Sequence, residues 1–135
     1  GFVQNHRSMI TTLAEALIME GDSTKAKEVL DFGMAKMPIE SVPYDVSSIG
    51  FIQGYLDIGE VEKGKEMALA MAKQFNDEIA YQQEKGRFDF SFRAKMRGLQ
   101  YISLILRNAG LLEESQQVLS MLQSQEDQLN LRSNF

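Results

Sequence analysis

The residues best suited to chemistry in this sequence are closely spaced acidic side chains. Asp57, Glu60 and Glu62 form one group, and Glu113 and Glu114 form another. Two neighbouring carboxylates can act as general acid and general base when their surroundings push their pKa values apart. Both groups, however, flank points where one helix is expected to end and the next to begin. Acidic residues in a first helical turn favourably oppose the helix dipole, so we interpret these acids as structural.

Other catalytic and ligand-binding patterns are missing from the sequence. It contains no cysteine and one histidine, His6. A single histidine with no acidic cluster at ligand spacing does not predict a metal site. No glycine-rich phosphate loop follows a strand, and no serine lies in a recognisable nucleophile motif. We therefore expect no catalytic residue, no cofactor and no metal in this chain.

The one local basic segment is RFDFSFRAKMR, residues 87–97. Its cations and aromatic residues are Arg87, Phe88, Phe90, Phe92, Arg93, Lys95 and Arg97. Such a mixture could stack nucleic-acid bases or contact anionic lipid. The phenylalanines recur with a period of two, which is typical of extended backbone. We favour a non-helical joint over residues 86–92, in which Phe90 is buried, with Ser91 as the cap of the following helix.

Composition limits the class of protein. The chain has 135 residues, of which 44% are hydrophobic and 24% charged, as suits one soluble globular domain. The longest apolar run, residues 67–72, is far shorter than the roughly 18 residues that a membrane span requires. A net charge of −5 argues against a general nucleic-acid binder. The first residues show neither an initiator methionine nor a signal-peptide pattern, so we expect a piece of a longer protein.

Helical periodicity dominates residues 10–38. Two apolar stripes at helical spacing are separated by a Gly-Asp-Ser turn, which indicates a pair of antiparallel helices. The first stripe is Ile10, Leu13, Ala14, Leu17 and Ile18; the second is Ala26, Val29, Leu30, Gly33, Met34 and Met37. Gly21 can end the first helix, Asp22 or Ser23 can cap the second, and Pro38 stops it.

Two further helix pairs are predicted after an extended connection over residues 38–44. The first helices of the three pairs should cover residues 9–20, 46–58 and 92–109, the middle one capped by Asp45. The fourth helix should begin near Val61 and run towards Lys85, and the sixth should follow Gly110. The polar end, residues 123–135, is expected to fray.

Three glycines, Gly21, Gly59 and Gly110, each separate one predicted helix from the next. Aligned on them, units at about 8–38, 45–85 and 91–125 resemble tetratricopeptide repeats. The matching positions are Leu13, Ala14, Leu17, Ala26, Leu30 and Pro38 in the first unit, Phe51 and Tyr55 in the second, and Ile102, Leu106 and Leu119 in the third. The resemblance implies an all-α fold in which three antiparallel helix pairs over residues 1–135 stack as one right-handed α-solenoid domain.

A second resemblance covers residues 13–45 and 54–67. These stretches are similar to the soluble C-terminal domain of bacterial polytopic membrane proteins that resemble protein O-mannosyltransferases, and MPIESVPY (residues 37–44) is the most distinctive part. The resemblance implies an accessory domain on the periplasmic face of the inner membrane. The catalytic acids of the transferase would then lie in the membrane part and not in this chain.

We therefore expect a non-catalytic domain that binds or positions a protein or peptide partner. It would bind no nucleic acid and would meet the membrane only through its parent protein. In stacked helix pairs the first helices line a concave face. The polar residues expected there are Thr12, Glu15, Gln53, Asp57 and Gln100. The alternative is an adaptor or scaffold unrelated to sugar transfer.

Overall fold

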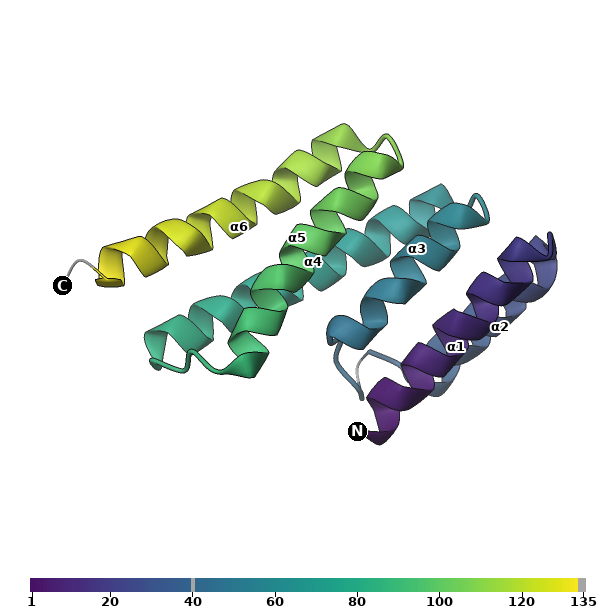
Figure 1. The fold of residues 1–135 in the computed structure, drawn as a ribbon, viewed down its shortest axis with the longest axis horizontal. Coiled ribbons are helices and arrows are strands. Elements are labelled where there is room, and N and C mark those ends of the chain that lie inside the picture. The colour runs from purple at the N-terminus through teal and green to yellow at the C-terminus, as the bar shows by residue number, and fades with distance from the viewer. Residues whose placement is uncertain (40, 134–135) are drawn as a thin grey trace. The chain divides into compact units, whose positions relative to one another are not determined.

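The computed structural model describes residues 1–39 and 41–133, and this part of the chain is all-α, as predicted (Figure 1). Its helices are α1 (Phe2–Met19), α2 (Ser23–Lys36), η1 (Val46–Ser48, a short 3-10 helix), α3 (Ile49–Asp57), α4 (Val61–Glu84), α5 (Phe90–Asn108) and α6 (Leu112–Ser133). Residue 40, inside the predicted extended connection, lies outside the described residues. No helix of the described residues is long and apolar enough to cross a membrane.

Two compact units make up the chain, and each is described by itself. Unit 1 is Gly1–Met67 and holds α1, α2, α3 and the start of α4. Unit 2 is Ala68–Phe135 and holds the rest of α4 with α5 and α6. In Figure 1, α1 lies beside α2 and α5 lies beside α6, each pair joined by a short turn. A single domain over residues 1–135 stays a prediction.

The three predicted glycine turns are confirmed. Gly21, Gly59 and Gly110 have φ angles of +83°, +83° and +79°, in the left-handed region that side chains disfavour. After each glycine the chain donates a backbone hydrogen bond back into the helix, as when Asp22 N donates to Leu17 O over 2.9 Å. Each helix therefore ends where its glycine stands, and the chain reverses at once.

Aspartates cap two of the helices in unit 1. Asp22 Oδ1 accepts a hydrogen bond from Lys25 N, 3.0 Å away, at the start of α2. Asp45 accepts from Ser47 N, while Ser48 Oγ accepts from Asp45 N, which forms a reciprocal capping box. Both capping positions had been predicted from the sequence.

The predicted joint over residues 86–92 is wrong in its second half. α5 begins at Phe90, and the cap is Asp89 instead of Ser91, because Asp89 Oδ1 accepts from Phe92 N over 3.0 Å. Because α5 is helical here, the side chains of Phe90 and Phe92, two positions apart, point to different sides of the helix. Phe92 is buried with 4% of its surface exposed, whereas Phe90 is 71% exposed.

The prediction for the first helix also needs correction. α1 begins at Phe2 instead of residue 9, and Leu13, expected in the core, is 52% exposed. The buried side includes Arg7, whose guanidinium donates to Pro43 O (3.0 Å) and Val42 O (2.7 Å). The side of α1 that carries Arg7 therefore faces the connection before α3, where the guanidinium satisfies two backbone carbonyls. Leu13 lies on another side of α1 and is exposed.

The last helix is longer than expected. α6 continues to Ser133, although residues 123–135 had been predicted to fray. Within this stretch Gln125 is buried, and its side chain joins α4 through hydrogen bonds described below. Buried polar side chains are tolerated when they are hydrogen-bonded. Gln125 therefore continues the buried side of α6 into a stretch that has few apolar residues.

Each unit has its own apolar core. In unit 1 the most deeply buried residues are Ala14, Ala26, Leu30, Phe51, Ile52 and Tyr55; in unit 2 they include Met71, Phe75, Ile79, Leu99, Ile102, Leu106 and Val118. Close helix contacts in unit 1 depend on glycine. A Cβ placed on Gly54 of α3 would lie 3.0 Å from Leu30 Cδ1 of α2, so the Leu30 side chain would have to shift to admit a larger residue.

Leucine truncation should separate core from surface in unit 1. Leu30, fully buried, should lose about 2–5 kcal/mol of unfolding free energy when changed to alanine, because a cavity remains. Leu13→Ala, the matched exposed control, should change it by less than about 0.5 kcal/mol. Urea denaturation measures both. Equal losses at the two sites would contradict the burial described above.

A second pair of variants tests the corrected start of α5. Phe92→Ala should cost about 3–5 kcal/mol, as truncation of buried aromatic residues does, whereas Phe90→Ala should cost less than about 0.5 kcal/mol. Thermal and urea melts of the two variants decide the matter. A larger loss at Phe90 would restore the extended joint.

Candidate functional site

A polar cluster around Asp31 joins three helices of unit 1. Asp31 Oδ1 accepts hydrogen bonds from Tyr55 Oη (2.7 Å) and Lys63 Nζ (3.1 Å), and its Oδ2 accepts from Lys27 Nζ (2.9 Å). Lys63 also lies 4.8 Å from the centre of the Tyr55 ring, within cation–π range. The cluster thus links α2, α3 and the first turn of α4.

Electrostatics give this cluster a structural role. Burial by itself would raise the pKa of Asp31, but the hydrogen bonds from Tyr55, Lys27 and Lys63 outweigh it and lower the pKa to about 2. Burial, and then the bond to Asp31, raise the pKa of Tyr55. Around neutral pH the carboxylate therefore stays ionised and the phenol protonated. Neither group is tuned to exchange a proton there, as a general acid or base must.

Three of the acids noted in the sequence, Glu62, Glu113 and Glu114, lie in first helical turns. Glu62 is in the first turn of α4, where Lys65 Nζ lies 3.2 Å from its Oε1, and Glu113 and Glu114 are in the first turn of α6. Among the described residues, no three His, Cys, Asp or Glu side chains gather in a way that could hold a metal ion. The ring of exposed His6 lies against that of Phe2, with centroids 4.0 Å apart and ring planes tilted by 41°.

In unit 2, amide side chains attach α4 to the α5–α6 hairpin. Gln83 Nε2 donates to Gln125 Oε1 (2.8 Å), and Gln125 Nε2 donates to Asn76 Oδ1 (2.8 Å). Lys95 Nζ lies 2.9 Å from Glu78 Oε2. One cation of the predicted basic segment is therefore paired with an acid of α4.

The remaining cations of α5 lie on its exposed side. Arg93, Arg97 and Arg107 recur at helical spacing, and α5 contains no acidic residue. The Arg97 guanidinium carbon lies 5.9 Å from the centre of the Phe90 ring, so Phe90 and Arg97 form one surface feature. α5 is thus a cationic helix face in a chain whose net charge is −5.

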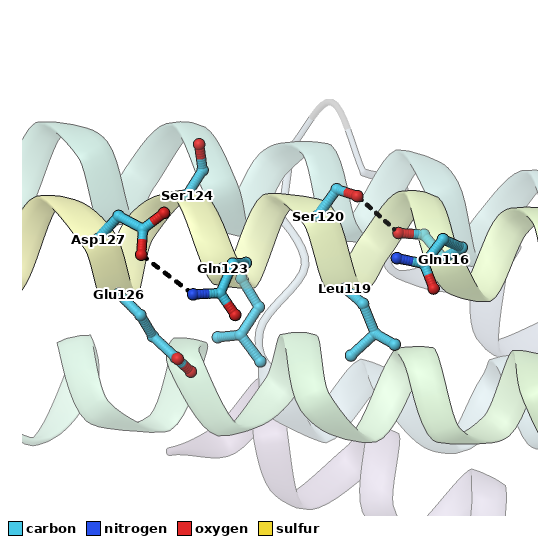
Figure 2. A pocket seen from close by; sticks show the side chains of 8 residues that line it. Gln116, Leu119, Ser120, Gln123, Ser124, Glu126 and Asp127 are labelled. Carbon is cyan, nitrogen blue, oxygen red and sulfur yellow. Dashed lines mark hydrogen bonds between the residues drawn. The ribbon is translucent and has the colours of Figure 1, made fainter.

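Several surface hollows lie along the α5–α6 hairpin. One lies between the two helices and is lined by Gln100, Ser103, Leu104, Arg107, Ser115 and Leu119. A second, on α6, shares Leu119, which points from α6 toward the neighbouring helix together with Glu126 (Figure 2). A third, near the start of α5, is lined by Phe88, Phe92, Arg93, Leu129, Arg132 and Ser133. We call the surface formed by the first two hollows the α5–α6 groove.

The five residues predicted to line a concave face are divided between the units. Thr12 and Glu15 are exposed on α1; on α3, Gln53 Nε2 donates to Asp57 Oδ1 over 2.7 Å. Gln100 belongs to unit 2, where it lines the α5–α6 groove. Of the five, only Gln100 lines one of the hollows described above.

Sequence reasoning missed most of this groove. It restricted the basic segment to residues 87–97 and did not include Arg107, and it used Leu119 only as a position that matches the tetratricopeptide repeat. A usable signal was present: residues 90–108 contain four cations and no acid, spaced so that three share one helical face. The exposure of Leu119 could not be inferred, because it depends on which helix lies next to the hairpin.

Comparisons with protein-family models, with curated proteins and with solved structures found no match to this chain.

The Asp31 cluster predicts a dependence of stability on acid pH. The pKa of Asp31 lies below its ordinary value of 3.8 in the folded chain, so its contribution is complete above about pH 4 and is lost as the pH falls towards 2. The stability difference between wild type and Asp31→Asn should therefore shrink over that window. Urea melts at stepped pH measure it. Asp77→Asn, which removes an exposed ion-paired carboxylate, is the control and should show a smaller change.

Proposed function

We propose that this chain is a non-catalytic domain that binds or positions a protein or peptide partner, built as a tetratricopeptide-like α-solenoid of three stacked helix pairs. The observation that carries the proposal is the likeness of its first and last hairpins. Aligned on Gly21 and Gly110, Ala14 corresponds to Ser103 and Ala26 to Ser115, and all four small residues are buried. Both hairpins therefore bring their helices together on small side chains at the same positions.

Repetition of this kind supports an interaction function. A short helix pair cannot bury its apolar stripe alone, so repeated pairs stack and leave extended surfaces along the array. Such surfaces bind partners through shape and charge, without a catalytic centre. We propose Thr12, Glu15, Gln53, Asp57 and Gln100 as partner-contacting residues of these surfaces.

We further propose that the domain is the C-terminal accessory part of a bacterial membrane protein of the O-mannosyltransferase type, facing the periplasm. This part of the proposal is supported by the resemblance of residues 13–45 and 54–67 alone. The coding sequence upstream of Phe2 tests it directly. Several apolar spans there would support the membrane parent, whereas a soluble domain would favour an adaptor unrelated to sugar transfer.

An interaction domain should have no transferase activity of its own. The purified chain, mixed with a lipid-linked mannose donor and an acceptor peptide, should yield no mannosylated product beyond the buffer blank. Mass spectrometry of the acceptor measures this. Product formation that a point change such as Glu60→Gln abolished would show a catalytic role and contradict the proposal.

A further inference from the structure

Two hollows meet at the end of unit 2 where α4 ends, α5 begins and α6 ends (Figure 1). The first is the hollow near the start of α5 described above. The second is lined by Gln83, Glu84, Lys85, Gly86, Phe88 and Arg132. Both hollows include Phe88 and Arg132, so together they form one surface, which we call the Phe88 surface. All of its residues belong to unit 2.

Three apolar side chains line the first hollow. Phe92 is buried, Leu129 is half-buried and Phe88 is 43% exposed. The rings of Phe88 and Phe92 meet edge to face with centroids 5.2 Å apart, which holds Phe88 against the start of α5. The volume of this hollow, about 380 Å³, is at the lower end of the roughly 300–1,000 Å³ of ligand pockets. It therefore suits one large apolar side chain of a ligand.

The charged residues that line this first hollow are both cations. They are Arg93 from α5 and Arg132 from α6, and both side chains are exposed. The neighbouring acid Asp89 is already engaged as the cap of α5, because its Oδ1 accepts from Phe92 N (3.0 Å) and Gln82 Nε2 (3.4 Å). Charge therefore selects an anionic group for the place beside the apolar lining.

The second hollow limits how much negative charge the surface can accept. Lys85 adds one cation there, and Glu84 adds one acid, so three cations face one acid around the whole Phe88 surface. Binding of an anionic membrane typically uses clusters of about four to eight Lys and Arg residues. Single-stranded nucleic acid needs a positively charged groove that follows several phosphates. A ligand with a few carboxylates fits this smaller cluster better than either polymer or membrane.

Gln83 provides a second, independent feature of the same surface. It lines the second hollow and is 2% exposed, and its side-chain oxygen Oε1 has no hydrogen-bond partner among the described residues. Its Nε2 donates to Gln125 on α6, which fixes the amide group in place. A ligand that reaches Gln83 from this hollow can satisfy Oε1 only with an N–H or O–H donor. A peptide backbone supplies such a donor at each residue except proline.

We propose that the Phe88 surface binds an acidic segment of a partner protein in which carboxylates flank one large apolar side chain. The apolar side chain would contact Phe88 and Leu129. The carboxylates would meet Arg93 and Arg132, because guanidinium groups pair with carboxylates through two parallel hydrogen bonds. This inference rests on the proposed interaction function, but it does not depend on a transferase parent.

The test uses the whole chain and synthetic peptides. The probe is a short fluorescein-labelled peptide with one central phenylalanine, two glutamates on each side of it, and glycine and serine elsewhere. Fluorescence anisotropy should show saturable binding that weakens as salt is raised, since exposed charge pairs are screened. Replacing all glutamates by glutamine, or the phenylalanine by serine, should each weaken binding by at least about fivefold.

Matched variants locate the binding site. Arg93→Gln, Arg132→Gln and Phe88→Ala should each weaken binding of the glutamate peptide by about fivefold or more. Arg107→Gln, farther along α5, and Phe90→Ala, an exposed phenylalanine that lines neither hollow, should change it by less than about twofold. The two arginine variants should leave binding of the glutamine peptide unchanged, because that peptide has no carboxylate for them to bind. Circular dichroism melts check that the variants remain folded.

A second measurement keeps the proposal testable if a variant unfolds. Amide chemical-shift changes in the wild-type chain on adding the glutamate peptide should centre on Gly86, Phe88 and Arg132. Shifts centred on Leu104 and Leu119 would overturn the inference, while leaving the interaction function in place.

Three further results would overturn it. The first is no saturable binding below about 1 mM peptide in low salt. The second is equal binding of the glutamate and glutamine peptides. The third is binding of phosphatidylglycerol vesicles or of a single-stranded oligonucleotide that requires Arg93 and Arg132, without binding of the peptide, which would assign these cations to another ligand.

Discussion

Close approach of helix backbones is the constraint on which the fold of each unit depends. Ala14 and Ala26 in the first hairpin, and Ser103 and Ser115 in the last, are buried small residues at corresponding positions. A hairpin assembled on small residues brings its two backbones near each other, so larger side chains are displaced to either side of the contact. Those displaced side chains form the two edges of a groove.

Polar contacts hold the neighbouring elements in place around these hairpins. In unit 1, Arg7 holds the connection that leads to α3, and Asp31 ties α3 and α4 to α2. In unit 2, the Gln83–Gln125 pair joins α4 to α6. Buried groups of this type are costly unless they are paired, so they tolerate few alternative helix positions.

Turns and helix caps could be predicted from the sequence, whereas the side of each helix that is buried against other helices could not. Glycine turns and aspartate caps depend on a few neighbouring residues, so Gly21, Asp22 and Asp45 could be placed from sequence. The period-two phenylalanines were misleading because three positions are too few to establish a period. The cap at Asp89 shows that the helix begins at Phe90. The exposed positions of Leu13 and Leu119 depend on distant partners, which periodicity does not report. For the same reason the candidate site was predicted only at Gln100.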